Sequence, residues 1–179
     1  MLSIKYLYIS MIMTITSLTS GFFTWINLNI PEVKHEETIN ISSIVQENIE
    51  YEKIDRVISL EKFFDSYNSP LKNHAETFIE VADKYGIDYK LMPSIACLES
   101  TCARFLIPGT HNPFGWGAGR IYFKSYDEAI ESVGKGLNDI YLSRGLDNAE
   151  KIAPVYNPPS PYSWTRGVNF FINKIEDVS

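Results

Sequence analysis

The sequence "LMPSIACLESTC", residues 91–102, is an almost continuous apolar or small-residue run that carries one carboxylate, Glu99. Leu91, Ile95 and Leu98 recur at helical spacing and predict a helix that buries one face. Glu99 borders this apolar stripe. Burial disfavours a charged carboxylate and raises its pKa, which would suit Glu99 to act as a general acid near neutral pH. The spacing alone equally permits a rim residue that reaches solvent or caps the next segment.

Capping signals predict further helices on both sides of this stretch. Ser69 and Pro70 are typical of a helix start, and Gly86 is typical of a helix end. Ser125 and Glu128 form a capping box before a second long apolar pattern. Shorter helices are expected from Ser59, which would act as a cap, over residues 147–153 between Asp147 and Pro154, and from Ser163 onward.

Residues 107–125, "IPGTHNPFGWGAGRIYFKS", are rich in glycine and proline and predict a loop, in which residues 120–123 are compatible with a short strand. The expected fold class is therefore mainly α: one helical domain with a Gly/Pro-rich loop or short β insertion.

The composition limits the function classes. The chain has 179 residues, a formal net charge of −6 and no Lys/Arg cluster, so nucleic-acid binding is not expected. Aromatic residues make up 13% of the chain, enough both to fill a core and to stack on sugar rings.

The N-terminal segment between Lys5 and Glu32 contains no charged residue. This uncharged segment is long enough for one transmembrane helix. The first alanine is Ala75, so the segment lacks an A-x-A-like cleavage site, and an uncleaved anchor is favoured over a cleaved signal peptide and secretion. Lys5 before the segment places the following chain outside the cytoplasm. We therefore expect a signal-anchor at residues 1–31, a polar tether at residues 32–58 and a domain at residues 59–179.

The motifs "NSPL", "KYGID", "IACLEST", "NPFGWG" and "SYDEAIESV" occur in this order between Asn68 and Val133. Together they resemble the lysozyme-like superfamily, in particular peptidoglycan lytic transglycosylase-like and bacterial endo-β-N-acetylglucosaminidase-like domains. The resemblance extends roughly over residues 60–175. It implies a lysozyme-like fold and an extracytoplasmic enzyme that cleaves peptidoglycan glycan strands.

The resemblance also implies roles for individual residues. Glu99 takes the position of the catalytic acid. The other matched positions imply substrate-binding residues: Ser100, Asn112, Phe114, Trp116, Tyr156 and Asn157. The loop "NPFGWG" lacks the Gly-Leu-Met-Gln sequence usual in lytic transglycosylases and is closer to the glucosaminidase-like pattern. Prolines follow the Tyr-Asn pair, so the bond that is cut and the form of the product stay open, as does a non-catalytic peptidoglycan-binding module.

No second catalytic carboxylate stands out in the sequence. Most glycosidases use two, and the candidates here are Asp127, Glu128, Asp139, Asp147 and Glu150. Three of them fall at capping positions, where capping is the simpler use. A single acid suffices if the N-acetyl group of the substrate attacks the anomeric carbon, which agrees with an amino-sugar polymer as substrate.

The two cysteines, Cys97 and Cys102, are five residues apart. In an unbroken helix this separation corresponds to about 9 Å between Cα atoms, beyond the roughly 7 Å that a disulfide tolerates. They can pair only if the helix ends near Ser100, and buried free thiols are the expected state. His35, His74 and His111 show no zinc spacing, so neither a metal nor another cofactor is expected.

Overall fold

The structure is a computed structural model that describes residues 41–179. The described part of the chain is helical and contains no strand, which confirms the mainly α class and removes the short strand expected at residues 120–123. Its elements are α1 (Ile41–Ser66), η1 (Pro70–His74), α2 (Ala75–Tyr85), α3 (Leu91–Ser100), α4 (Tyr126–Ile140), η2 (Leu142–Arg144), α5 (Ala149–Tyr156) and α6 (Pro161–Glu176).

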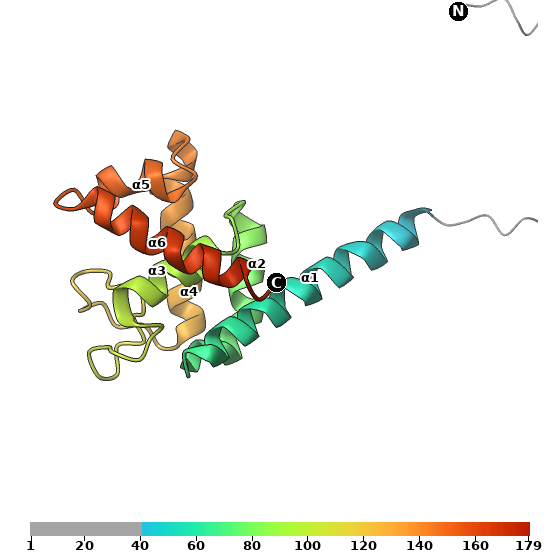
Figure 1. The fold of residues 1–179 in the computed structure, drawn as a ribbon, viewed down its shortest axis with the longest axis horizontal. Coiled ribbons are helices and arrows are strands. Elements are labelled where there is room, and N and C mark those ends of the chain that lie inside the picture. The colour runs from blue at the N-terminus through green and yellow to red at the C-terminus, as the bar shows by residue number, and fades with distance from the viewer. Residues whose placement is uncertain (1–40) are drawn as a thin grey trace, which may run out of the picture. The chain divides into compact units, whose positions relative to one another are not determined.

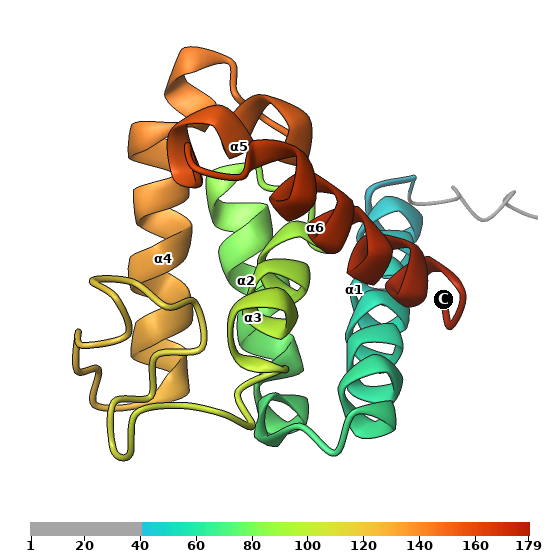
Figure 2. The same ribbon diagram turned by 60° about the vertical axis from the view of Figure 1, so that its left-hand side comes forward.

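Helix α3 is the central element of the described domain (Figures 1 and 2). All seven residues from Leu91 to Cys97 are buried. Helix α6 packs against α3, where Gly167 allows close approach because a Cβ there would lie 2.6 Å from Leu98 Cδ1. Helix α2 packs against α4, and α5 packs against α6. Residues 91–100 therefore form a core helix with one carboxylate near its end.

The expected end of α2 and start of α4 are confirmed, whereas Ser69 caps the 3-10 helix η1 and α2 itself begins at Ala75. The Ser69 hydroxyl accepts a hydrogen bond from Leu71 N at 3.0 Å, and Gly86 ends α2 in the left-handed conformation, with φ of 65°. Ser125 accepts a hydrogen bond from Glu128 N at 3.1 Å at the start of α4. These local signals act within one helical turn, which is why the sequence alone reveals them.

The helix expected to start at Ser59 begins at Ile41 instead, so much of the predicted polar tether is helical. Ion pairs attach α1 to α2 from Lys53 onward, whereas residues 41–52 of this helix are exposed. Arg56 makes two hydrogen bonds to Asp83, at 2.7 and 3.0 Å, and Lys53 reaches Glu80 at 3.1 Å. Each exposed ion pair contributes little to stability. Together the pairs attach the charged side of α1 to α2, a contact that the local sequence does not predict.

Two later helices also differ from the prediction. The cap of α5 is Asn148, whose Oδ1 accepts from Lys151 N at 3.1 Å, and not Asp147. Pro154 lies inside this helix, which continues to Tyr156. Helix α6 begins at Pro161, before the predicted Ser163, because proline suits the first helical position.

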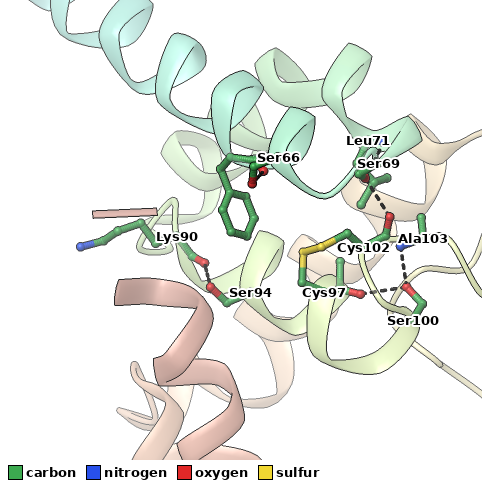
Figure 3. Close-up of a disulfide and its surroundings, with 11 residues drawn as sticks. Ser66, Ser69, Leu71, Lys90, Ser94, Cys97, Ser100, Cys102 and Ala103 are labelled. Carbon is green, nitrogen blue, oxygen red and sulfur yellow. Dashed lines mark hydrogen bonds between the residues drawn. A yellow bond between two sulfur atoms is a disulfide. The ribbon is translucent and has the colours of Figure 1, made fainter. Parts of the chain in front are cut away.

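Cys97 and Cys102 form a disulfide with an Sγ–Sγ distance of 1.95 Å, so the expectation of free thiols is wrong (Figure 3). The condition for pairing is met because α3 ends at Ser100. Thr101 and Cys102 then adopt left-handed φ values of 52° and 54°, which turn the chain back toward α3.

Hydrogen bonds hold this turn in place (Figure 3). The Ser100 hydroxyl donates to Ala96 O at 2.8 Å and accepts from Ala103 N at 2.9 Å. The Ser69 hydroxyl, from the segment before η1, donates to Cys102 O at 2.7 Å. The end of α3 is therefore fixed by the disulfide, by Ser100 and by a contact from a distant part of the chain.

Among residues 41–179, no helix is long and apolar enough to span a membrane. The predicted signal-anchor at residues 1–31 lies outside the described residues.

We expect the Cys97→Ser/Cys102→Ser double variant of the full chain to lose about 2 kcal/mol of unfolding free energy, because the bond closes a short loop in the unfolded chain. Urea unfolding measures this loss. A reductant should lower the stability of the native protein by a similar amount and leave the double variant unchanged. Equal stability of the native and double-variant proteins would contradict the prediction.

Candidate active site

Glu99 lies where two adjacent hollows of the surface meet. The first hollow has a volume of about 480 Å³ and is lined by Glu99, Phe114, Gly115, Trp116, Gly117, Ile140, Tyr141, Tyr156 and Asn157. The second hollow has a volume of about 330 Å³ and is lined by Glu99, Ser100, Phe105, Leu106, Ile107, Asn112, Gly115, Ala118 and Gly119. The hollows share Glu99 and Gly115, so together they form a groove that passes over the carboxylate.

The two oxygens of Glu99 differ in their surroundings. Trp164 Nε1, from α6, donates a hydrogen bond to Glu99 Oε1 at 2.9 Å. Glu99 Oε2 accepts no hydrogen bond from the described residues and faces Gly115, where an added Cβ would lie 3.5 Å from it. Gly115 has a φ of 68°, which favours glycine, and its missing side chain leaves this oxygen uncovered.

Burial raises the pKa of the Glu99 carboxyl, and the hydrogen bond from Trp164 partly opposes this shift. The two effects have opposite signs because desolvation favours the neutral acid, whereas an N–H donor favours the carboxylate. Glu99 is exposed to the groove as a whole residue, but its contact with Trp164 is partly buried, and it retains its proton to higher pH than an ordinary glutamate because its pKa is raised. This is the property expected of a general acid.

Tyr156 connects α5 to the loop beside Glu99. Its ring packs on Trp164 with centroids 4.8 Å apart, and its hydroxyl donates to Phe114 O at 3.1 Å. Burial, together with the negative charge of Glu99, raises the pKa of the Tyr156 phenol, so it stays neutral and remains a donor. Asn157 caps the end of α5 and lines the first hollow.

Trp116 lies in the loop and lines the first hollow, as expected of a residue that stacks on a sugar. One edge of its ring packs on α4 at Gly136, where an added Cβ would lie 2.2 Å from Trp116 Cη2. The glycine therefore makes room for the indole. Phe114 is buried and packs near Phe78, with ring centroids 6.3 Å apart, so its side chain belongs to the core.

Asn112 and Ser100 line the second hollow, but their side chains form hydrogen bonds with other groups of the protein. Asn112 Nδ2 donates to Trp116 O at 2.8 Å, and Asn112 Oδ1 accepts from Trp116 N at 3.2 Å. This pair of bonds fixes the loop that carries Gly115. Ser100 supports the end of α3, as described above. Both residues thus shape the groove, and their direct contact with substrate stays a prediction.

Trp164 is buried, with 3% of its surface exposed, and its position on the apolar stripe of α6 indicates only a core role. Its bond to Glu99 is a functional contact that the sequence did not reveal. Tyr141, at the C-terminal end of α4, also lines the first hollow. No local signal links Trp164 to an acid 65 positions earlier; only the packing of α6 on α3 brings them together.

The five candidates for a second catalytic carboxylate all lie away from both hollows. Each has a partner elsewhere: His74 and Thr77 for Asp127, Lys124 N for Glu128, Lys135 for Asp139, Lys151 for Asp147 and Asn169 for Glu150. Among the described residues, Glu99 is the only carboxylate that lines the groove.

No group of three or more His, Cys, Asp or Glu side chains in residues 41–179 is placed to hold a metal ion. Compared with known proteins, the chain matches no family model, and no curated protein matches its sequence.

We expect Trp164→Phe to raise the pKa of Glu99, because the ring is largely kept while the N–H donor to Oε1 is lost. Carboxyl-resolved NMR titration of the full chain with ¹³C-labelled glutamate measures the shift. Tyr162→Phe, at a position 79% exposed, is the control and should leave the titration of Glu99 unchanged. An unchanged or lower pKa in Trp164→Phe would show that the hydrogen bond does not stabilise the carboxylate.

Proposed function

We propose that residues 59–179 form a lysozyme-like domain that cleaves peptidoglycan glycan strands at β-1,4 bonds between amino sugars, with Glu99 as the general acid. The observation that carries this proposal is the placement of one acid, with a raised pKa and an uncovered oxygen, at the junction of two hollows. The motif resemblance of the sequence supports the same function.

The groove suits a polymer that is cut within its length. A strand that occupies both hollows would pass its scissile bond over Glu99 Oε2. Protonation of the leaving oxygen by this group is general acid catalysis. Trp116 and Tyr156, both partly exposed, line the first hollow and offer aromatic surface for the apolar faces of sugar rings.

A mechanism with one protein carboxylate needs the substrate to stabilise the positive charge at the anomeric carbon. The N-acetyl group of an amino sugar supplies an oxygen for this attack. In the first route, Glu99 then acts as a base on the 6-hydroxyl of the sugar, which closes a 1,6-anhydro ring without consuming water. In the second route, water opens the intermediate and leaves a reducing end.

The transglycosylase-like motifs favour the first route. The "NPFGWG" loop favours the second route, which corresponds to a hydrolytic endo-β-N-acetylglucosaminidase. Both act on the same class of substrate and use Glu99 first as an acid.

We place the domain outside the cytoplasm, held at the cell membrane by the predicted anchor at residues 1–31. The Cys97–Cys102 disulfide supports this location, because such bonds persist mainly in oxidising compartments. Peptidoglycan lies in the same compartment.

We expect Glu99→Gln to lower the cleavage of purified cell walls by a factor of about 10² to 10⁴, because glutamine keeps the shape but cannot donate the proton. Release of soluble muropeptides measures the rate. In the native protein, kcat/KM should fall as pH rises through the raised pKa of Glu99, since the deprotonated form has no proton to give.

Glu150→Gln is the matched control, because Glu150 lies outside the groove and pairs with Asn169. It should retain native turnover. Native turnover in Glu99→Gln would remove Glu99 from the catalytic role. Binding of walls without cleavage by the native protein would identify a peptidoglycan-binding module instead.

The two routes give different products, and we expect 1,6-anhydro ends. Borohydride reduces an ordinary reducing end to a sugar alcohol and adds two hydrogens, whereas an anhydro end resists reduction. Mass spectrometry of fragments before and after borohydride separates the two. If every new end gains the two hydrogens, the protein is a hydrolase, and the reduced sugar identifies the bond that was cut.

A further inference from the structure

Helix α1 exposes large apolar side chains over much of its length. Residues 41–52 are all exposed, and Figure 1 shows this end of α1 extending beyond the other helices. Seven large apolar residues of α1 expose between 41% and 73% of their surface: Ile41, Ile44, Val45, Ile49, Tyr51, Ile54 and Ile58. A helical segment of about 12 residues is only marginally stable in water without packing. Exposed apolar side chains that gather on such a segment indicate a binding surface.

Four of these residues lie on one side of α1. Ile44, Tyr51 and Ile58 are seven residues apart, and Ile54 lies between the last two, which is the spacing of a seam between paired helices. At about 100° per residue, this side lies roughly opposite Arg56, which pairs with α2. We call Ile44, Tyr51, Ile54 and Ile58 the apolar seam. The apolar seam therefore faces away from α2 and is accessible to another helix.

Acidic residues occupy the two other positions of this spacing. Glu47 takes the position after the first isoleucine of the apolar seam, and Glu61 takes the position after the last. Neither carboxylate forms an ion pair within residues 41–179. Lys72, whose pKa Glu61 helps to raise, pairs with Asp65 at 2.8 Å. The side of α1 that carries the apolar seam thus has two carboxylates that no described cation contacts directly.

A hollow between α1 and the start of α2 adjoins the apolar seam. It has a volume of about 220 Å³ and is lined by Glu50, Lys53, Ile54, Val57, Ile58, Glu61 and Glu76. Lys53 is bonded to Glu76 at 3.2 Å, so this cation is already engaged. The carboxylates of Glu50 and Glu61 have no ion-pair partner within residues 41–179. A hollow with apolar and acidic lining suits a lysine or arginine side chain, which has an apolar stem and a charged head.

We propose that the apolar seam binds an amphipathic helix of another protein, with apolar residues along its contact face and Lys or Arg opposite Glu47 and Glu61. Burial of the apolar seam removes its side chains from water, and the cations of the partner neutralise the two acids. The inference is independent of the proposed function, because no residue of the apolar seam lines the groove at Glu99.

The two acids disfavour a second copy of this chain as the occupant. In a parallel pair of α1 helices, Glu47 would face Glu47 and Glu61 would face Glu61. In an antiparallel pair with Tyr51 opposite Ile54, each acid would face an isoleucine. Like charges in contact and carboxylates buried without a cation are both unfavourable. An anionic lipid surface is disfavoured in the same way, because it would repel the carboxylates on this side of α1.

The test uses two fluorescently labelled synthetic peptides of residues 41–65. One has the native sequence. The other, the charge-reversed peptide, carries Glu47→Lys/Glu61→Lys and so presents the same apolar seam with cations opposite the acids of the protein. The full chain is held in nanodiscs of zwitterionic lipid, and fluorescence anisotropy reports affinity.

We expect the charge-reversed peptide to bind about 10- to 30-fold more tightly than the native-sequence peptide, because two like-charge contacts become opposite-charge contacts. This preference should shrink at high ionic strength, which screens exposed charges. The same Glu47→Lys/Glu61→Lys change in the full chain should reverse the preference between the two peptides.

Variants of the full chain separate binding at the apolar seam from unspecific apolar contact. Tyr51→Gln/Ile54→Gln should weaken binding of the charge-reversed peptide about 10- to 100-fold. Tyr162→Gln/Phe170→Gln, at positions 79% and 53% exposed on α6, is the matched control and should bind as the parent does. Circular dichroism checks that each variant is folded.

Equal or tighter binding of the native-sequence peptide by the native protein would identify a second copy as the occupant and overturn the proposal. Binding of neither peptide, including the case in which lipid covers the apolar seam, would also overturn it. So would equal affinities of Tyr51→Gln/Ile54→Gln and the parent for the charge-reversed peptide.

Discussion

The hydrogen bond from Trp164 to Glu99 closes a circuit of contacts on which the candidate site depends. Trp164 packs on Tyr156, Tyr156 donates to Phe114 O, and the next residue, Gly115, faces the second oxygen of Glu99. The circuit joins α3, α5, α6 and the loop after α3 around one carboxylate. Because partly buried hydrogen bonds are costly to leave unmade, each element holds the others in position.

The circuit has a rigid base at the end of α3. Glu99 is the second-last residue of that helix, and the disulfide joins Cys97 in the helix to Cys102 in the turn that follows. The left-handed residues after Ser100 would cost energy in an isolated peptide. The disulfide, the Ser100 hydroxyl and the bond from Ser69 to Cys102 O stabilise them together. A site with one acid needs this precision, because no second carboxylate in the groove can compensate for a misplaced one.

The features that could be predicted from sequence are those set within one or two helical turns. The caps at Ser69 and Ser125, the end of α2 at Gly86 and the buried face of α3 all follow from local patterns. The features that were missed depend on contacts between distant residues. Helix α1 pairs its charges with α2 only from Lys53 onward, and the disulfide forms because α3 stops before Cys102.

The candidate site divides in the same way. Glu99 could be identified from its position on an apolar helix and from the motif resemblance. Trp116 and Tyr156 line the groove where the motifs place them, whereas Phe114 and Asn112 serve mainly to build it. Trp164 has two roles, and sequence periodicity reveals only one of them, because a helical stripe indicates burial and not what the polar edge of a buried indole contacts.

Two opposing effects set the pKa of Glu99. Burial favours the neutral acid, while Trp164 stabilises the carboxylate. The pKa is raised on balance, so the carboxyl keeps its proton to higher pH than an ordinary glutamate and can donate it. Trp164 and Tyr156 occupy one side of Glu99 with donors that stay neutral, so neither competes for this proton. The nucleophile for the proposed reaction must then come from the substrate, which is why the proposal requires a sugar that carries its own acetamido group.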